Sequence, residues 1–570
     1  MNSNKIVIKL FYHSKNLKID LKNYIENNSK FLKNEFLIFC KNLENKKFNN
    51  QNLSKLYETQ KNHNLWEMSL LKEKSNLKSD NIFKSIVFLA IRKIINDNRF
   101  EKIIFYNVPI EKKIITSYLE NKNKRIFYEF ISSGKPKKTI KLFLSNFFLF
   151  RFIYHFLKLI FKIFLELRKN KFRDKNSNLI IFSYFAHFKN LKKNKINFNQ
   201  FGNLENILEK RFILDNQYIF VPNKNNLKYN SVQNKYSILN GNLKLKNKIL
   251  ILYKFLFYSF KFFFIKKLIF TKLKDYELSL FHILSKDYDL SFNGSIFIEN
   301  LIWIEVFENY LSKTSKKKIG IFLMENQGWE KAMITSWKNY NHGKIIGYTP
   351  TSINYWHLYN FDLSKKKYAS PSKILVSSSE GYKLLKNQYK KKNIELLKVE
   401  SLWFNYLLNI KNKIISRKKG IVLIIGDYNS KNNYKIFKIV SNSNLNKSNK
   451  IFFKPHPHDL NYYNIKNITL TNKNNEYFFE KTSLIISPGS TAGILEYLFF
   501  GKKVFVYDDP FGFDLSPIKH LNYQFKFKSV KDFNKLLDIN FKKTKIINTF
   551  KKYYFLDNEL KRWKNILYIL

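Results

Sequence analysis

Two polar segments in the last third of the chain carry residue types suited to holding an anion. The first, KPHPH, begins at Lys454, and its two prolines fix a turn that presents a lysine and two histidines. The second, SPGSTAG, begins at Ser487 and leads into an expected helix, ILEYLFFG. Free backbone N–H groups and the positive dipole end at a helix start favour a phosphate, so Ser490 and Thr491 are candidate ligands. Glu496, about one turn into that helix, is expected to reach a ribose hydroxyl from the same face.

A third polar segment follows the run GIVLII, where Gly426 allows a tight turn and close approach of the backbone to a ligand. Simpler interpretations stay open, because a serine or threonine before a helix is commonly a cap and an isolated His-Pro pair is commonly a turn. Zinc binding by His456 and His458 would need further ligands, and none has the spacing of a recognised site. We therefore predict no metal.

The middle of the chain offers carboxylates at a strand end. Glu325 follows the apolar run IGIFLM, and Glu330 lies five residues on, at an expected helix start. A carboxylate there can take a proton from a reacting group, and His342 and His357 are further candidates. Glu330 can equally serve only to complement the helix dipole. Trp329 offers a ring face for stacking, although a buried tryptophan is commonly part of a core.

The elements that must position these residues alternate between short apolar runs and helical patterns. Strands are expected at Lys5–Tyr12, Lys102–Val108, Arg125–Ile131, Asn178–Phe185, Tyr218–Pro222, Lys318–Glu325, Lys344–Tyr348, Lys373–Ser377, Gly420–Ile425, Lys450–Lys454, Ser483–Ser487, Lys503–Tyr507 and Tyr523–Phe527. Short apolar runs of this kind are typical of parallel strands buried on both faces. Because ligands bind at the carboxyl ends of such strands, we expect the KPHPH and SPGSTAG turns to meet in one crevice.

This alternation predicts an α/β fold with two doubly wound Rossmann-like domains facing a cleft. An N-terminal α/β extension is expected at residues 1–170, one domain at 171–385 and the other at 386–570. The polar, lysine-rich segment Ser379–Leu402 is expected to be the hinge between the two domains.

Composition narrows the class of protein. The 570 residues include 102 Lys and Arg against 43 Asp and Glu, a formal net charge of +59, and a single cysteine, Cys40. A hydrophobic share of 45% excludes a wholly disordered chain, and one thiol excludes an internal disulfide and indicates a reducing compartment. The positive field attracts nucleic acid, anionic lipid or a charged sugar nucleotide. We do not expect nucleic acid as a partner, because the basic residues are spread along the chain and no common nucleic-acid-binding module is recognised.

Two aromatic-rich segments, Leu142–Leu167 and Ile249–Leu273, resemble membrane segments but are broken by charges at helical spacing, so neither is expected to span a bilayer. Two interpretations stay open: basic helices lying in a lipid interface, or internal helices whose lysines reach solvent. The N-terminus resembles a first strand more than a signal peptide. We therefore expect a cytoplasmic protein, with peripheral attachment to the anionic inner face of the cytoplasmic membrane as a plausible addition.

The motifs KPHP and SPGSTAGILEYLFFGKKVFVYDDP resemble the HP and S motifs of two-domain GT-B glycosyltransferases, especially bacterial sialyltransferases and Kdo transferases that use CMP-activated sugars. The earlier part of the chain is similar to predicted bacterial surface-carbohydrate (O-antigen) biosynthesis proteins. That likeness is carried by Trp66-Glu67, Glu73-Lys74, FSYFAHF at Phe182–Phe188, MENQGWEKAMITSW at Met324–Trp337, GKIIGYTPTSINYWHLYNF at Gly343–Phe361 and KVESLWFNYL at Lys398–Leu407.

The resemblance implies a metal-independent glycosyltransferase that needs no cofactor. Its C-terminal domain would bind a CMP-linked sugar of the nonulosonic acid or Kdo type. The preceding domain would bind a glycan acceptor of a cell-surface polysaccharide or lipopolysaccharide. Carried onto this sequence, His456 and Pro457 would contact the cytidine, Ser490 and Thr491 would bind the phosphate, and Lys454 would add charge. The nucleotide-binding prediction comprises Gly426, Lys454, His456, Pro457, Ser487, Ser490, Thr491 and Glu496.

For the reaction itself, Glu325 is the first candidate for the general base and Glu330 the second. Asn326, Gln327 and Trp329 would then shape the acceptor or sugar pocket. The sequence departs from the family pattern in two ways. Pro488 and Gly489 stand where more polar residues often occur, and the acidic catalytic pair of sialyltransferases has no clear match.

Two other functions remain as alternatives. One is glycerol-phosphate transfer from CDP-glycerol, whose enzymes also use an HP turn and a serine-rich turn. The other is a non-catalytic, basic membrane-binding or nucleic-acid-binding protein with a degenerate site. The presence of Lys454, His456, Ser490, Thr491 and Glu496 together argues against the second alternative.

Overall fold

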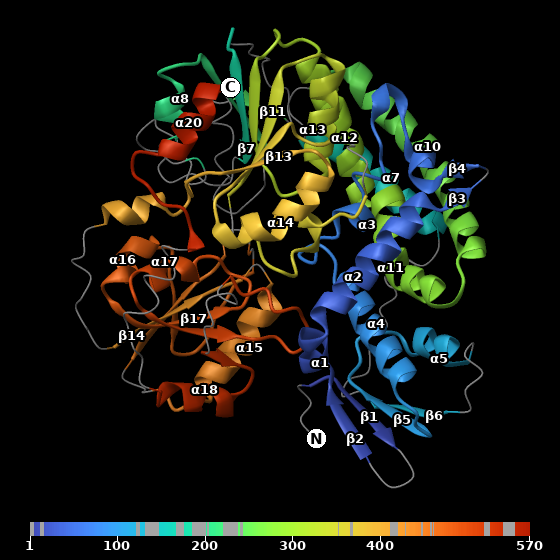
Figure 1. The fold of residues 1–570 in the computed structure, drawn as a ribbon, viewed down its shortest axis with the longest axis vertical. Coiled ribbons are helices and arrows are strands. Elements are labelled where there is room, and N and C mark those ends of the chain that lie inside the picture. The colour runs from blue at the N-terminus through green and yellow to red at the C-terminus, as the bar shows by residue number, and fades with distance from the viewer. Residues whose placement is uncertain are drawn as a thin grey trace.

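The computed structural model describes most of the chain. The described residues are 5–11, 16–48, 50–120, 126–131, 148–166, 176–184, 201, 204–219, 237–239, 243–350, 353–364, 369–410, 420–427, 429–445, 449–456, 459, 461–517, 525–539 and 553–569. They form an N-terminal extension, a middle domain and a C-terminal domain, each built around its own sheet (Figure 1).

The N-terminal extension has a four-stranded sheet in the order β2-β1-β5-β6, in which only β5 and β6 are parallel. Its strands are β1 (Val7–Phe11), β2 (Asn16–Asp20), β5 (Lys102–Tyr106) and β6 (Phe127–Ile131), with a small hairpin of β3 (Lys47–Phe48) and β4 (Gln51–Asn52). Its helices are α1 (Leu21–Asn27), α2 (Ser29–Asn45), α3 (Leu70–Glu73), α4 (Asn81–Asp97) and α5 (Lys112–Glu120).

The middle domain has a seven-stranded parallel sheet in the order β13-β12-β11-β10-β7-β8-β9. Its strands are β7 (Leu179–Tyr184), β8 (Leu214–Ile219), β9 (Ser237–Ile238), β10 (Ile319–Leu323), β11 (Lys344–Thr349), β12 (Lys373–Val376) and β13 (Glu395–Lys398). Its helices are α7 (Phe148–Phe161), α8 (Leu204–Leu208), α10 (Leu245–Lys272), α11 (Asp275–Asn293), α12 (Ser295–Leu311), α13 (Gly328–Asn339) and α14 (Ser379–Lys391).

The C-terminal domain has a six-stranded parallel sheet in the order β16-β15-β14-β17-β18-β19. Its strands are β14 (Ile421–Ile425), β15 (Lys450–Lys454), β16 (Ile468–Leu470), β17 (Thr482–Pro488), β18 (Lys503–Tyr507) and β19 (Lys526–Phe527). Its helices are α15 (Ser430–Ser441), α16 (Asn475–Phe479), α17 (Ile494–Phe499) and α18 (Val530–Leu537).

Both parallel sheets are buried on their two faces, which is why their strands are apolar runs rather than alternating patterns. In β14, Val422 and Ile424 pack into one hydrophobic cluster, whereas Leu423 and Ile425 pack into another on the opposite face. In β10, Phe322 packs into one hydrophobic cluster, whereas its neighbours Ile321 and Leu323 pack into a second. The expected fold is therefore present: two doubly wound, Rossmann-like domains in a GT-B-like arrangement, with an N-terminal α/β extension.

The predicted hinge over Ser379–Leu402 is wrong. Most of this segment forms α14 and the edge strand β13, which belongs to the middle sheet. Leu385 and Tyr389 turn inward from α14, while most of the lysines that made the segment look like a linker lie on its outer face. The predicted domain boundary at residue 386 consequently falls inside α14. Strand β8 also begins four residues before the predicted Tyr218–Pro222.

The end of the chain returns from the C-terminal domain to the middle domain. The last helix, α20 (Lys561–Ile569), carries Trp563, which is fully buried beside Tyr348 of β11 at a ring-centroid distance of 5.1 Å. The Trp563 indole N–H donates to the carbonyl oxygen of Glu400 at 3.0 Å, and the Glu400 carboxylate accepts from the Arg562 guanidinium at 3.1 Å. This return fastens the two Rossmann-like domains together.

The carboxyl edges of the two sheets meet through the loop after β18. Asn354 of the middle domain donates to the carbonyl of Leu515 in this loop at 2.6 Å. The Trp356 ring, also of the middle domain, stacks on the ring of Phe513 in the loop, with the ring centroids 4.5 Å apart. Lys22 of α1 lies 3.6 Å from Asp508. In the same loop, Asp509 pairs with Lys435 of α15 at 3.0 Å. The N-terminal extension, the middle domain and the C-terminal domain therefore meet at the loop after β18.

No helix among the described residues is both long enough and apolar enough to cross a membrane. The Leu142–Leu167 segment is described from residue 148, where it forms α7 and a wider helical turn over Lys162–Glu166. The Ile249–Leu273 segment lies almost entirely in α10.

The returning helix yields a stability prediction. Trp563→Ala removes a fully buried ring and a hydrogen bond, so it should destabilise the protein by about 3 to 5 kcal/mol. The matched control Lys564→Ala, on the exposed face of the same helix, should change stability by less than about 0.5 kcal/mol. Urea unfolding followed by circular dichroism measures both. Equal midpoints for the two variants would mean that α20 does not fasten the domains.

Candidate functional site at the carboxyl edges of the two sheets

Three loops of the C-terminal domain converge, because β14 lies between β15 and β17 and all three strands run parallel. The Gly426 N–H donates to the Lys454 carbonyl at 2.8 Å. From the loop after β17, the Thr491 hydroxyl donates to the Gly426 carbonyl at 3.3 Å, and the Ser490 hydroxyl donates to the Asp427 carboxylate at 2.7 Å. The structure thus brings the three predicted polar segments to one edge of one sheet.

A second link joins the loops through Asn475, the first residue of α16. Its side-chain amide donates to the Glu496 carboxylate at 2.6 Å, and its amide oxygen accepts a hydrogen bond from the Lys454 ammonium. Glu496 is buried, and its charge together with burial raises the pKa of Tyr406, burial being the larger cause. Lys454 and Glu496, far apart in the sequence, therefore share one partner.

The predicted nucleotide-binding residues differ in how they are presented. Ser490, Thr491, Lys454 and His456 are half-buried at the edge of the sheet. Ser487 is fully buried, and its hydroxyl donates to the Ile425 carbonyl at 3.2 Å, so it connects β17 to β14. The remaining predicted residue, Pro457, lies outside the described residues, as does the following histidine.

Three polar residues of this edge were not among the predicted site residues, although Asp427 belongs to the polar segment that follows GIVLII. Asp427 accepts from Ser490, and its backbone N–H donates to the Asn433 side chain at 2.9 Å. Asn433 also donates to the Asp459 carboxylate at 3.0 Å. Asp427 lies directly after the predicted Gly426, so its position at a strand end was the available signal. Asn433 and Asn475 carried no sequence signal, because each lies inside or at the start of a helix.

On the facing edge, the turn after β10 is held by Glu330. Its two carboxylate oxygens accept from the backbone N–H groups of Glu325 and Asn326 at 2.8 and 2.9 Å. Asn326 has a positive φ of 58°, a left-handed conformation that asparagine tolerates. Burial raises the pKa of Glu330 to about 8, against the opposing effects of the Glu325 and Gln327 backbone N–H groups and of Lys331. Glu330 is thus placed as a residue that shapes the turn.

Glu325 lies in a polar chain that begins in the N-terminal extension. Glu73 pairs with Lys78 at 2.8 Å, Lys78 donates to the Gln327 amide oxygen at 3.3 Å, and the Gln327 amide donates to the Glu325 carboxylate at 2.6 Å. Glu325 is half-buried, whereas Glu73 is buried and its pKa is raised mainly by burial. Glu325, Asn326 and Gln327 therefore lie together at the end of β10.

The other candidates from this region are placed apart from that group. Trp329 is 5% exposed and packs against the rings of Phe307 and Phe322, in the core. His342 precedes β11, at the amino end of the sheet, where its ring lies 4.7 Å from the Trp337 ring. His357 accepts from the Asn354 N–H at 3.3 Å, close to the contact with the C-terminal domain.

A cavity of about 40 Å³ lies beside Asn326, between the extension and the middle domain. This volume suits a few water molecules or one small polar group. Its lining is mostly charged or polar and includes Glu67, Lys72, Glu73, Lys74, Asn326, Lys331, Tyr359, Asn360, Asp362, Gln388, Tyr389 and Lys392. Two of the sequence segments quoted for the family resemblance, Trp66-Glu67 and Glu73-Lys74, contribute to it, as does the MENQGWEKA segment.

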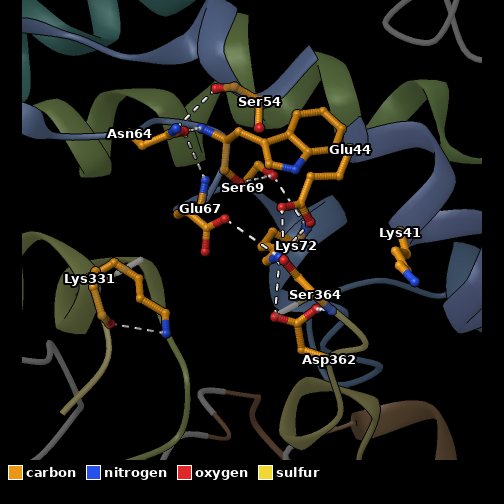
Figure 2. A network of polar contacts seen from close by, with 12 residues as sticks. Lys41, Glu44, Ser54, Asn64, Glu67, Ser69, Lys72, Lys331, Asp362 and Ser364 are labelled. Carbon is orange, nitrogen blue, oxygen red and sulfur yellow. Dashed lines mark hydrogen bonds and ion pairs between the residues drawn. The ribbon is translucent and has the colours of Figure 1, made fainter. Parts of the chain in front are cut away.

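Lys72 is the centre of the charged network around this cavity (Figure 2). Its ammonium group lies 2.6 Å from Glu44, 3.2 Å from Asp362 and 3.5 Å from Glu67. Burial opposes the charged state of Lys72, but the three carboxylates outweigh it and raise its pKa.

Asp362 receives a second cation, Lys392, at 2.8 Å. Burial alone would raise the pKa of Asp362, but Lys72, Lys74 and Lys392 together hold it well below its ordinary value. Lys74 is buried and Lys331 is half-buried near the cavity, and desolvation lowers the pKa of each. The network therefore fixes several charges at the carboxyl edge of the middle sheet.

Within the described part of the chain, no group of three or more His, Cys, Asp or Glu side chains is arranged to hold a metal ion. One edge therefore presents the hydroxyls of Ser490 and Thr491, the ammonium group of Lys454 and the imidazole of His456, all half-buried. The facing edge presents the half-buried carboxylate of Glu325.

No model of a known protein family and no curated protein matches the sequence. Solved plant structures show a distant likeness. Arabidopsis thaliana UGT89C1 is 9% identical with a TM-score of 0.36, and the match covers 66% of this chain and 94% of that chain. The same protein complexed with quercetin is 8% identical with a TM-score of 0.38, and the match covers 68% of this chain and 98% of that chain. Phytolacca americana UGT2, complexed with UDP-2fluoro-glucose and pterostilbene, is 8% identical with a TM-score of 0.31, and the match covers 67% of this chain and 93% of that chain.

The network around Lys72 yields a second prediction. Lys72→Met leaves three carboxylates near one another without their shared cation, which should cost about 3 to 5 kcal/mol of stability. Lys41→Met, an exposed lysine drawn in the same view, is the matched control and should be neutral (Figure 2). Urea unfolding at neutral pH compares them.

The same comparison has an expected pH dependence. The pKa of Asp362 is lowered in the folded protein, relative to its ordinary value of 3.8. The stability that the ion pairs of Asp362 contribute is therefore present above pH 3.8 and is lost as the pH falls below that value. The difference between Lys72→Met and the parent protein should therefore shrink in acid. A Lys72→Met variant as stable as Lys41→Met at neutral pH would contradict the role assigned to Lys72.

Proposed function

We propose that this protein is a glycosyltransferase that moves a sugar from a nucleotide donor to a glycan acceptor. The observation that carries the proposal is the convergence of the loops after β14, β15 and β17, which gathers Lys454, Ser490 and Thr491 at one edge. That edge faces a second strand end, which carries the half-buried Glu325. In open α/β sheets, ligands bind at such carboxyl edges.

We further propose that the donor is a CMP-linked sugar of the nonulosonic acid or Kdo type. The support is the resemblance of KPHP and SPGSTAG to the motifs of transferases that use such donors. The acceptor class, a cell-surface polysaccharide or lipopolysaccharide, rests on the resemblance of ENQGWEKA and its neighbours to O-antigen biosynthesis proteins. We place the protein in the cytoplasm, which agrees with its single cysteine.

In the proposed reaction, an acceptor hydroxyl oxygen attacks the anomeric carbon of the donor sugar. The hydroxyl proton passes to the Glu325 carboxylate, and the bond between the anomeric carbon and the phosphate oxygen breaks with its electron pair on CMP. Lys454 and the hydroxyls of Ser490 and Thr491 would stabilise the charge that develops on the leaving phosphate. Gln327, which donates to Glu325, would hold the base in place.

Glycerol-phosphate transfer from CDP-glycerol is the competing reaction that the same two motifs favour. Incubating the purified protein with a panel of CMP-sugars, and separately with CDP-glycerol, distinguishes them by which substrate releases CMP. Release of CMP from a CMP-sugar supports the proposal. Release from CDP-glycerol alone would replace it, and steep salt-dependent binding to DNA without binding of any nucleotide would favour a non-catalytic protein.

Glu325→Gln should lower turnover by about 100-fold or more, because the amide cannot accept the proton, while nucleotide affinity stays unchanged. Glu559→Gln, at an exposed position near the C-terminus, is the matched control. Single-turnover CMP release measures the rate and calorimetry the affinity. Full activity of Glu325→Gln would reject this residue as the base.

His456→Ala should weaken CMP binding by about tenfold, as expected for loss of one good polar contact. His282→Ala, on the exposed face of α11, is the control and should bind CMP as the parent protein does. Titration calorimetry with CMP gives both values. Equal affinities for the two variants would remove the assignment of His456 to the donor site.

A further inference from the structure

Helices α7 and α10 form one flank of the middle domain, on the side away from the C-terminal domain (Figure 1). They pack antiparallel: Phe148 lies 4.2 Å from Phe263, and Phe152 lies 5.7 Å from Phe255. Helix α10 has 28 residues and is therefore about 42 Å long. It packs against α11 and α12 with one stripe of buried side chains.

Helix α10 carries a second apolar stripe, which faces outward. Its members recur every three or four residues and are each between 38% and 63% exposed: Leu245, Ile249, Tyr253, Leu256, Phe257, Phe260, Phe264 and Leu268. A surface helix of a soluble protein normally has one apolar stripe, with polar residues opposite it. The second stripe therefore requires a partner of its own or is exposed to water at a cost in free energy.

Helix α7 and the turn after it extend this apolar surface. Seven large side chains there are between 43% and 60% exposed: Leu149, Phe150, Ile153, Tyr154, Leu157, Phe161 and Phe164. The two stripes meet, since Phe260 contacts Phe148 and Phe152, and the Lys248 ammonium lies 5.2 Å from the Phe164 ring centroid. Together they hold 15 of the 28 large apolar side chains exposed in the described part of the chain.

The charges of these two helices are all of one sign. Residues 148–161 and 245–272 contain nine Lys and Arg and no Asp or Glu. Three of the nine are turned toward carboxylates of α11 and α12: Arg151 and Lys266 pair with Asp289, and Lys254 pairs with Glu305. The outward surface of α7 and α10 is consequently aromatic, aliphatic and basic.

We propose that the outward face of α7 and α10 docks on the surface of an anionic lipid bilayer, with both helices lying parallel to the membrane. Apolar side chains would enter the headgroup and upper acyl region, and the lysines would contact lipid phosphates. A second copy of the chain does not suit this face, because two such faces would bring cations against cations. This inference is independent of the proposed transferase reaction.

The test is co-sedimentation of the full chain with vesicles. One set is pure phosphatidylcholine, and the other contains about one third phosphatidylglycerol, an anionic lipid. The face predicts binding to the anionic vesicles at least tenfold tighter than to the neutral ones, weakened by added salt. The triple variant Tyr253→Ser, Phe257→Ser, Phe264→Ser should lose at least tenfold of the binding to anionic vesicles.

The control is a triple serine variant at exposed aromatic positions elsewhere, Phe127→Ser, Tyr462→Ser and Tyr568→Ser, which should bind as the parent does. Circular dichroism and the midpoint of urea unfolding, compared with those of the parent, report whether either variant has lost its fold. A charge variant, Lys158→Glu with Lys267→Glu, should weaken binding to anionic vesicles, whereas Lys431→Glu with Lys438→Glu should not.

Three results would overturn the proposal. The first is no binding of the parent protein to either vesicle. The second is vesicle binding that the α10 triple serine variant retains in full. The third is a dimer, or a complex with single-stranded RNA, that the triple serine variant abolishes while vesicle binding stays unchanged.

Discussion

The parallel direction of the strands is the constraint on which the rest of this structure depends. Because every strand in the middle and C-terminal sheets runs the same way within its sheet, all the loops that follow the strands gather at one edge. The two edges are then brought together by the loop after β18 and by the returning helix α20. Polar residues far apart in sequence meet there for that reason alone.

The N-terminal extension adds a second level of organisation. It delivers Lys72 and Lys78 to the carboxyl edge of the middle sheet, where Lys78 donates to Gln327 in the turn after β10 and Lys72 pairs with Asp362 in the loop after β11. Buried ion pairs are costly to assemble and still more costly to break, so they fix the position of the extension more than they add net stability. The environment of Glu325 is thus set by residues of the extension as well as of its own domain.

Much of this architecture follows from the sequence. Strands β15 and β18 occur at the predicted residues, because each is an apolar run bounded by polar turn residues. The segment Ser379–Leu402 misled the prediction, since the lysines on one face of α14 hid the inward-facing Leu385 and Tyr389. Composition alone does not reveal such a face when the polar side is this long.

The network around Lys72 could not be predicted, because its four charged members come from α2, the segment around α3 and the loop after β11. Pairings across such separations are set by tertiary packing and leave no local pattern. The motif pairs Trp66-Glu67 and Glu73-Lys74 marked the region without revealing its partners. The aromatic character of α10 was visible in the sequence, but which of its rings face outward was not.

A structure of the protein in complex with CMP would locate the donor site. The phosphate should lie within hydrogen-bond distance of Ser490 or Thr491, near Lys454, with the cytosine on the side of His456. A nucleotide bound instead in the cavity beside Lys72, or on a surface remote from the loops after β14, β15 and β17, would contradict this assignment.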